Sequence, residues 1–342
     1  MSQDAPLPDA RPLNWVDRHA PEALKPWLKL GRFDRPIGIW LLLIPCWQGI
    51  ALFYASSDTA FGEFGLWLVA AFAGGAVLMR AAGCAFNDVV DRDIDRQVAR
   101  TADRPVAAGR ISVKQALAFI AACCLISFLL LLTMNAVTLG LAMASLALVA
   151  AYPFMKRITW WPQAWLGLTF NWGALMGFAA AVGGLPAAAW LFVAQAQAVG
   201  DQIWMAERLA QYGHVSWPAA LLYLGGVFWT LGYDTIYALQ DIEDDAMVGV
   251  KSSARRLGRG VRTGVAVFYG LAVLMAAVAG MSAGLGPGFA VLLVTYAAHL
   301  AWQVARLRPD DPALALALFK SNREAGLILL AAITLGAVHP WS

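Results

Sequence analysis

Oxygen-bearing side chains recur at four-residue intervals in the segment covering residues 80–95. Asn87, Asp91 and Asp95 are each four residues apart, and Arg80 precedes Asn87 by seven residues. Because four residues advance an α-helix by about 400°, these side chains would share one helical face. Carboxylate and amide oxygens suit Mg²⁺, which binds them together with the phosphate oxygens of a substrate. We therefore predict that Asn87, Asp91 and Asp95 are metal ligands.

Two other carboxylates of the same segment, Asp88 and Asp93, lie on other helical faces, and we interpret them as solvated groups at a helix end. Arg80 is different because it lies inside an apolar run, where an ionisable side chain usually has a functional role. A guanidinium group binds phosphate or carboxylate through paired hydrogen bonds. We therefore predict that Arg80 binds the anionic group of a substrate.

A second acidic row ends a later apolar run. Asp234, Asp241 and Asp245 are separated by seven and four residues, which again predicts one helical face, and Asp234 lies two turns deeper than Asp241. Glu243 and Asp244 fit a simpler role at the end of the helix. Asp241 and Asp245 are further predicted metal ligands. Two such rows can hold two Mg²⁺ between them, and this pair would neutralise a diphosphate so that it leaves as a stable anion.

Basic and phenolic side chains gather near the same ends of the apolar runs. Each is a candidate for binding the diphosphate, although a positive residue at such a place can also be an anchor that only sets membrane topology. The candidates for diphosphate binding are Arg32, Arg35, Arg80, Tyr152, Lys156 and Arg157.

Composition indicates that a membrane protein positions these residues. The chain has 342 residues, of which 60% are hydrophobic and 14% charged, whereas soluble domains carry about 25% charged residues. Apolar runs of about 18 residues or more recur along the chain, which is typical of transmembrane helices. The net charge of +3 gives no support to nucleic-acid binding. The four cysteines lie in apolar runs without metal-ligand spacing, so we interpret them as small apolar groups.

The predicted fold class is all-α, a polytopic bundle of nine transmembrane helices in a lipid bilayer. Because the two acidic rows end the second and sixth spans, both face the same side of the membrane. This favours two four-helix pseudo-repeats plus a ninth helix around a central cavity. The predicted spans are residues 37–55, 65–86, 115–133, 136–154, 163–183, 218–238, 263–282, 286–304 and 322–338.

The distribution of Lys and Arg sets the expected orientation. These residues concentrate in alternate links, which places the N-terminus in the cytoplasm and the C-terminus outside. Residues 1–31 lack the apolar core of a secretory signal and are too acidic for a typical transit peptide. We therefore expect a cytoplasmic lead-in before a single transmembrane domain at residues 32–342, in a bacterial plasma (inner) membrane. The link 185–217 contains an amphipathic stretch, which fits either an interfacial helix or a tenth hydrophobic segment that lies on the membrane surface.

The acidic segments resemble the motifs of a known family, the intramembrane aromatic prenyltransferases or UbiA family, over about residues 28–338. The first motif is similar at Asn87, Asp91, Asp95, Arg100-Thr101, Arg104-Pro105 and Gly109. The second is similar at Tyr233-Asp234-Thr235, Asp241, Asp245 and Gly249-Val250-Lys251-Ser252. The run from Tyr152 to Arg157 and the pair Pro162-Gln163 resemble the branch that prenylates hydroxybenzoate.

The resemblance implies a nine-helix bundle whose central cavity opens sideways to lipid, and an Mg²⁺-dependent enzyme. It implies transfer of a polyprenyl group from polyprenyl diphosphate to a ring carbon of 4-hydroxybenzoate, a step of ubiquinone biosynthesis. It also implies that Mg²⁺–diphosphate is bound by Asp91, Asp95, Asp241 and Asp245, aided by Arg80, Lys156 and Tyr152. Asn87 and Asp234 would lie beside the acceptor and the metal. Asp91, Asp234 or the phosphate itself would take the ring proton, so the candidate catalytic residues are Asn87, Asp91 and Asp234.

Two alternative functions fit some of these observations. A prenyltransferase for another acceptor, as in haem O, menaquinone or chlorophyll synthesis, would carry the same acidic rows. An ion-coupled transporter would also carry acidic groups in its spans. A transporter would place those groups near the bilayer midplane, whereas these rows lie at one face of the membrane.

Overall fold

The computed structural model describes residues 14–97, 101–184, 186–187, 214–242, 249 and 251–337. Over this part of the chain the structure is helical, and one isolated bridge joins Asn135 to Pro186. The predicted all-α fold class is therefore confirmed. The link 185–217 lies outside the described residues except at its two ends, so its predicted interfacial helix stays a prediction.

Among the described residues, a long helix lies at each place where an apolar run predicted a span. These helices are α3 (Ile37–Ala55), α4 (Glu63–Val90), α6 (Val113–Leu131), α7 (Ala136–Ile158), α8 (Pro162–Ala181), α11 (Trp217–Tyr237), α14 (Val261–Ser282), α15 (Pro287–Arg306) and α17 (Asn322–Leu335).

Six helical segments of the described chain are long and apolar enough to cross a membrane. They are α3, α4, α6, α7, α15 and the segment Ser253–Ser282, which contains α14. By contrast, α17 has 14 residues, which rise about 21 Å against a hydrocarbon core of about 30 Å. The membrane bundle is therefore confirmed, while the count of nine spans and the two pseudo-repeats stay predictions.

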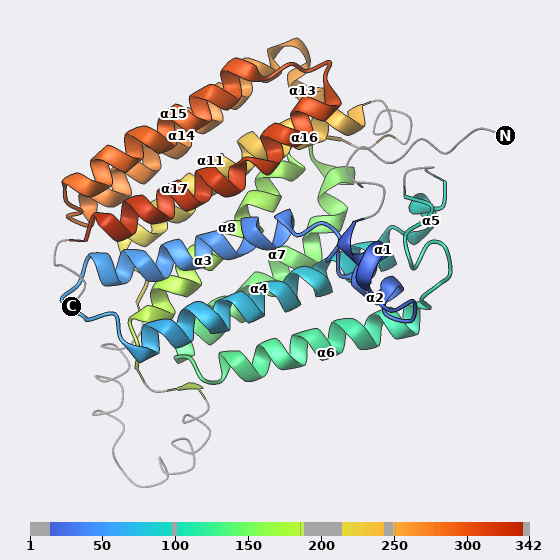
Figure 1. The fold of residues 1–342 in the computed structure, drawn as a ribbon, viewed down its shortest axis with the longest axis horizontal. Coiled ribbons are helices and arrows are strands. Elements are labelled where there is room, and N and C mark those ends of the chain that lie inside the picture. Colours follow the sequence, from blue (N-terminus) through green and yellow to red (C-terminus); the bar gives the residue numbers. More distant parts are fainter. Residues whose placement is uncertain are drawn as a thin grey trace, which may run out of the picture.

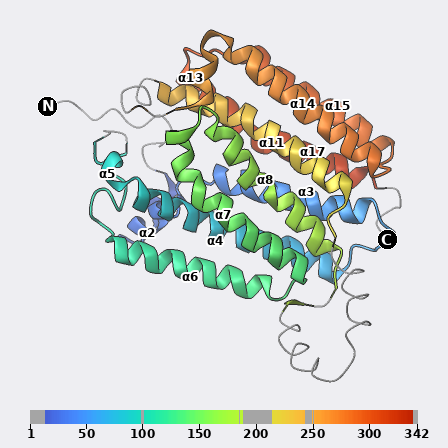
Figure 2. The same ribbon diagram turned by 180° about the vertical axis from the view of Figure 1, so that it is seen from behind.

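The long helices lie side by side and alternate in direction, so successive links fall at opposite ends of the bundle (Figure 1, Figure 2). α3 contacts α4, α8 and α17, and 67% of an apolar 18-residue stretch of this helix is buried. In α6 and in α7, only 17% of a stretch of the same length is buried. The central helices are thus enclosed by protein, while α6 and α7 leave apolar faces that suit contact with lipid.

Glycines allow α3 and α8 to approach each other closely. A Cβ at Gly49 would come within 2.1 Å of the carbonyl oxygen of Ala174, and a Cβ at Gly177 would come within 2.2 Å of that of Cys46. Small residues at helix contacts permit the close backbone approach by which helices associate in lipid. This contact fixes the relative position of two helices that line the site described below.

Short helices gather at one end of the bundle (Figure 1). They are α1 (Trp15–His19), α2 (Lys25–Leu30), α5 (Arg92–Asp95), α13 (Ser253–Leu257) and α16 (Pro312–Lys320), with 3₁₀ turns η2 (Ala238–Asp241) and η3 (Gly258–Gly260). Leu30, at the end of α2, is fully buried and packs with Ala85 and Val106. The last part of the expected lead-in is therefore fixed against α4, and the domain boundary near residue 31 stays a prediction.

Candidate active site

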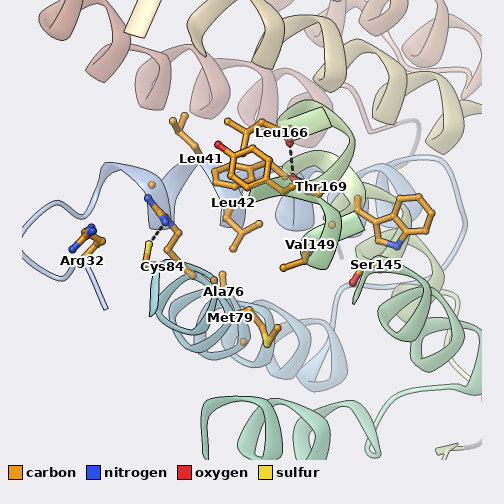
Figure 3. A pocket seen from close by; sticks show the side chains of 18 of the residues that line it. Arg32, Leu41, Leu42, Ala76, Met79, Cys84, Ser145, Val149, Leu166 and Thr169 are labelled. Atoms are coloured by element: carbon orange, nitrogen blue, oxygen red, sulfur yellow. Dashed lines mark hydrogen bonds between the residues drawn. The ribbon is translucent and has the colours of Figure 1, made fainter. Parts of the chain in front are cut away.

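A cavity of about 670 Å³ lies between helices α3, α4, α6, α7, α8, α11 and α16. Most of its lining is apolar, including Leu42, Met79 and Val149, which Figure 3 shows together. Charged and amide side chains enter the lining from the links and helix ends of one end of the bundle: Arg32, Arg35, Asn87, Asp88, Asp91, Arg104, Lys156 and Lys320. The cavity therefore combines a charged end with an apolar interior.

The first acidic row bends at Asp91. α4 ends just before this residue and α5 begins just after it, with Asp91 at a ψ of 4°. Asp91 N donates to Asn87 O at 2.9 Å and Asp95 N donates to Asp91 O at 2.8 Å, so helical hydrogen bonds continue through the bend. Asn87 and Asp91 line the cavity, and Asp95 does not. The straight helical face that we predicted for the row is therefore wrong beyond Asp91.

The two carboxylates Asp91 and Asp95 each have basic partners. Lys156 Nζ donates to Asp91 Oδ2 at 2.5 Å, and Arg157 Nη2 donates to Asp91 Oδ1 at 2.9 Å. Arg104 Nη1 donates to both oxygens of Asp95, at 3.0 and 2.8 Å. Both carboxylates are buried, so their charges need these partners. Two candidates for diphosphate binding thus contact a candidate metal ligand.

Arg80 lines the cavity from within α4. Its guanidinium contacts Cys84 Sγ and lies over the ring of Phe170, 6.0 Å from the centroid. A Cβ at Gly38 would come within 2.4 Å of Arg80 Nε, so a glycine at this place on α3 leaves room for the guanidinium. Arg80 Nε is buried without a hydrogen-bond partner in the described part of the chain. These surroundings suit a ligand-binding group better than an anchor that reaches for lipid headgroups.

α11 brings the second acidic segment to the same cavity. Asp234 lines it, and so does Tyr152 on α7. α11 ends three residues after Asp234, and η2 follows it up to Asp241. The α-helix that we predicted to continue from Asp234 to Asp241 therefore ends at Tyr237 and gives way to a 3₁₀ turn, which has about 3.0 residues per turn, and the common face of the two side chains stays a prediction. The side chain of Asp241 and the whole of Asp245 lie outside the described residues.

The chain that follows the second acidic segment is attached to α7 and α8. Ser253 N donates to Gln163 Oε1 at 3.0 Å, and the hydroxyls of Ser253 and Thr235 lie 2.6 Å apart. Lys251 N donates to Lys156 O at 2.9 Å. Gln163, Thr235 and Ser253 are all buried. These contacts join the segment after the second acidic row to the motif residues Lys156 and Gln163.

Sequence reasoning missed Asp88. We interpreted it as a solvated group, and this is wrong, because its side chain is 1% exposed and lines the cavity. Its partner, Arg32, precedes it by 56 residues and donates to it at 2.6 Å; a contact over this distance leaves no local pattern. Asp93 is 67% exposed, as predicted. Arg104, which we quoted only as part of a motif, lines the cavity beside these residues.

Arg32 and Arg35 both line the cavity from the link before α3. Arg35 Nε donates to Asp34 at 3.2 Å. Burial is the largest single influence and by itself lowers the pKa of the Arg32 guanidinium, but Asp88 together with the nearby Cys84, Asp34 and Asp95 outweighs it, so this pKa lies above its ordinary value. Arg32 is therefore positively charged at the charged end of the cavity.

The donor atoms of the site suit a hard cation such as Mg²⁺, which prefers oxygen ligands. Asn87, Asp91 and Asp234 line one cavity, and Asp88 Oδ2 is buried without a hydrogen-bond partner in the described chain. Within the described residues, three or more Asp, Glu, His or Cys side chains do not come together to hold a metal. The two-metal arrangement, which also needs Asp241, stays a prediction.

Comparisons with known proteins place this geometry in context. Residues 42–325 match the UbiA prenyltransferase family. A curated relative from Bos taurus, 4-hydroxybenzoate polyprenyltransferase, mitochondrial, is 38% identical over 333 residues, which are 96% of this chain and 81% of the relative.

Solved structures show the same fold. A UbiA homolog from Aeropyrum pernix K1 has a TM-score of 0.65 and 26% identity, covering 86% of this chain and 96% of its own. A UbiA homolog from Archaeoglobus fulgidus, bound to GPP and Mg²⁺, has a TM-score of 0.59 and 17% identity, covering 92% of this chain and 100% of its own. The second likeness concerns the fold alone.

The relatives also correct one expectation. Curated relatives from Bos taurus, Rattus norvegicus and Homo sapiens are named as mitochondrial proteins, which contradicts the expected location in a bacterial plasma membrane. The physical reason is that apolar spans and the distribution of Lys and Arg indicate a bilayer and an orientation. They do not distinguish one membrane from another.

Proposed function

The chain belongs to the UbiA prenyltransferase family, and we propose that it transfers a polyprenyl group from polyprenyl diphosphate to a ring carbon of 4-hydroxybenzoate. The observation that carries this proposal is the cavity, which joins a charged end to an apolar interior. A prenyl diphosphate has the same division into an anionic head and an apolar tail. The acceptor follows from the name of the relative from Bos taurus, and the resemblance of the sequence motifs implies a step of ubiquinone biosynthesis.

The charged end supplies the groups that bind the donor. Lys156 lines the cavity and contacts Asp91. Arg157 contacts the same carboxylate but is not part of the cavity lining. Arg offers phosphate a planar pair of hydrogen bonds, and Lys offers it a compact charge. We assign diphosphate binding to Arg32, Arg35, Arg80, Tyr152, Lys156 and Arg157.

Mg²⁺, when bound, neutralises the charge of the leaving diphosphate. We assign its binding to Asn87, Asp91, Asp95, Asp241 and Asp245. Asp91 would then exchange Lys156 and Arg157 for the cation, and this exchange frees two basic side chains for the phosphate oxygens. The ion pairs around Asp91 support this proposal, because they show that the carboxylate and the basic side chains neutralise one another before the substrate binds.

The remaining steps depend on the cavity wall and on a base. The bond between the allylic carbon and the diphosphate oxygen breaks, and the apolar lining keeps water from the carbocation that forms. The ring carbon ortho to the phenol hydroxyl then bonds to the allylic carbon and loses its proton. Asp91 and Asp234 line the cavity and can accept this proton, as can the phosphate, while Asn87 would hold the acceptor.

Product formation by the purified protein tests the proposal. The protein in detergent is incubated with MgCl₂, a polyprenyl diphosphate and 4-hydroxybenzoate, and the product mass is measured. The expected product is 4-hydroxybenzoate carrying one prenyl group, and benzoate, which lacks the activating hydroxyl, should give none. Product with another aromatic acceptor alone would assign the chain to a different branch of the family. No prenylated product with any acceptor would contradict the proposal.

A further inference from the structure

A buried ion pair joins two distant parts of the chain at the charged end of the cavity. Arg32 belongs to the link between α2 and α3, and Asp88 belongs to the last turn of α4. Arg32 Nη2 donates to Asp88 Oδ1 at 2.6 Å, and both residues line the cavity. The side chain of Asp88 is 1% exposed and that of Arg32 is 16% exposed. A carboxylate buried this deeply is costly unless its charge has a partner.

The backbone of Arg32 is strained. Its φ of 57° lies in the left-handed region, and no other non-glycine residue in the described chain has a positive φ. Side chains with a Cβ are sterically disfavoured there, so such a conformation persists where surrounding contacts hold it, often at functional sites. Arg32 Nη1 also donates to Lys29 O at 3.0 Å. Contacts at both ends of the guanidinium thus fix where the side chain points.

We propose that Asp88 is a positioning residue, whose carboxylate holds Arg32 in place so that its further N–H groups bind the diphosphate of the donor. This inference rests on the proposed function in one respect, namely that the donor is a diphosphate. Arg104 lies 3.6 Å from the same oxygen of Asp88 but is held independently by Asp95. Loss of Asp88 should therefore act mainly through Arg32.

Binding of a donor analogue tests the proposal without relying on turnover. The probe is geranyl S-thiolodiphosphate, which keeps the diphosphate but resists ionisation, and its Kd for the purified full chain is measured by calorimetry at saturating Mg²⁺. Asp88→Asn keeps the size of the side chain and removes its charge. We expect this variant to raise the Kd of the analogue by about tenfold or more, with the Kd of 4-hydroxybenzoate unchanged. Asp93→Asn, at an exposed carboxylate, should leave both constants unchanged.

A double-mutant cycle separates positioning from other roles of Asp88. If Asp88 acts through Arg32, then Asp88→Asn should have little further effect on analogue binding in the Arg32→Ala background. Additive effects of the two substitutions would overturn the proposal. A direct metal ligand would instead raise the Mg²⁺ concentration needed for analogue binding even in the Arg32→Ala background, and this result would also overturn it.

Two further variants keep the test valid if Asp88→Asn does not fold. Asp88→Asn/Arg32→Gln removes both charges together, and it should fold but bind the analogue as weakly as Arg32→Ala. Arg32→Gly removes the side chain and relieves the left-handed strain, so it should unfold at a higher temperature than Arg32→Ala while binding the analogue equally weakly. Equal unfolding temperatures would contradict the role given to the strained backbone.

Failure of the proposed function would be a distinguishable result. Wild-type protein that binds the analogue but makes no product from 4-hydroxybenzoate would contradict the assigned acceptor and leave the inference about Asp88 intact. An unchanged Kd in Asp88→Asn would overturn the positioning role, whatever product the wild type makes. Wild-type protein that does not bind the analogue at all would overturn both.

Discussion

Arg80 occupies space that a glycine on the neighbouring helix leaves open. A Cβ at Gly38 would lie 2.4 Å from Arg80 Nε and 2.6 Å from its Nη2. The functional interest of Arg80 could be predicted from the sequence, because a charge inside an apolar run is costly. Its dependence on Gly38 could not be predicted, because a glycine in an apolar run does not indicate which side chain it faces.

We expect Arg80→Lys to lower kcat/KM by about 10²-fold, as loss of a charge-stabilising donor does in other enzymes. Lysine keeps the positive charge but loses the planar pair of donors that phosphate or carboxylate needs. Steady-state kinetics at saturating Mg²⁺ measure the effect. Arg92→Lys, at a partly exposed residue that pairs with the exposed Asp93, is the control and should be near normal. Near-normal turnover in Arg80→Lys would show that Arg80 only anchors α4.

Gly38→Ala tests the same group from the opposite helix. The added methyl group must displace the Arg80 guanidinium, so we expect a loss of kcat/KM that approaches that of Arg80→Lys. Gly140→Ala is the matched control, because a Cβ at Gly140 meets nothing within 4 Å. If Gly38→Ala were fully active, the guanidinium could work from another position, and the observed place of Arg80 would not matter for turnover.

Asp91 is a proposed Mg²⁺ ligand, and it contacts two side chains, Lys156 and Arg157, that we assign to diphosphate binding. We expect a chelator to abolish turnover and Mg²⁺ to restore it, and we expect Asp91→Asn to lose turnover even at high Mg²⁺. Its partners Lys156 and Arg157 are 32% and 44% exposed, so solvent can replace the lost ion pairs and the cost in stability should be below about 1 kcal/mol. Activity assays and thermal unfolding measure the two effects. Full activity in Asp91→Asn would refute the proposed metal site.

At the scale of elements, the apolar runs placed the long helices to within a few residues. The predicted span 37–55 coincides with α3, and the predicted span 136–154 begins where α7 begins. This works because helix length in a bilayer is set by the thickness of the hydrocarbon core. The bend at Asp91 and the 3₁₀ turn η2 could not be predicted from spacing, since four- and seven-residue spacing assumes that an α-helix continues. Both irregularities lie where acidic residues meet the charged end of the cavity.

The hydrogen bonds among Gln163, Ser253 and Thr235 attach α13 to α8 and α11, just beyond the second acidic segment. We expect Gln163→Met to destabilise the protein by about 1–3 kcal/mol, because the buried N–H of Ser253 loses its acceptor. The KM for the donor should rise as well, because Lys251 N also bonds to the carbonyl of Lys156.

Thermal unfolding and donor kinetics measure these two effects of Gln163→Met. Gln97→Met, at an exposed glutamine, is the control and should change neither quantity. An unchanged unfolding temperature would show that the hydrogen bond contributes nothing to stability. A lowered temperature with an unchanged KM would confine its role to the fold.

At the scale of the whole molecule, the direction of the helices places the reactive groups at one end. α4 and α11 both run toward the end where the short helices gather (Figure 1); Asp91 directly follows α4, and Asp234 lies in the last turn of α11. The ion-coupled transporter considered from the sequence would place such groups near the bilayer midplane. Charged groups at one end, with an apolar cavity behind them, suit chemistry on an amphiphile whose tail stays in the membrane.

The same arrangement predicts which links share a side of the membrane. Asp58 lies in the link between α3 and α4, at the end opposite the site, whereas Asp103 follows α5 and Asp310 precedes α16 at the site end. We expect Asp103→Cys and Asp310→Cys to react with an impermeant maleimide from one side of sealed vesicles, and Asp58→Cys from the other.

Three native cysteines are buried and Cys124 is half-buried, so the experiment uses a background in which all four are replaced by alanine, with activity confirmed first. Because α3 and α4 each have the length and hydropathy of a span, labelling of Asp58→Cys and Asp103→Cys from the same side would mean that α4 does not cross the membrane. The acidic row at the end of α4 would then not lie at a membrane surface. The cavity would not be oriented to receive a lipid-like donor from the bilayer.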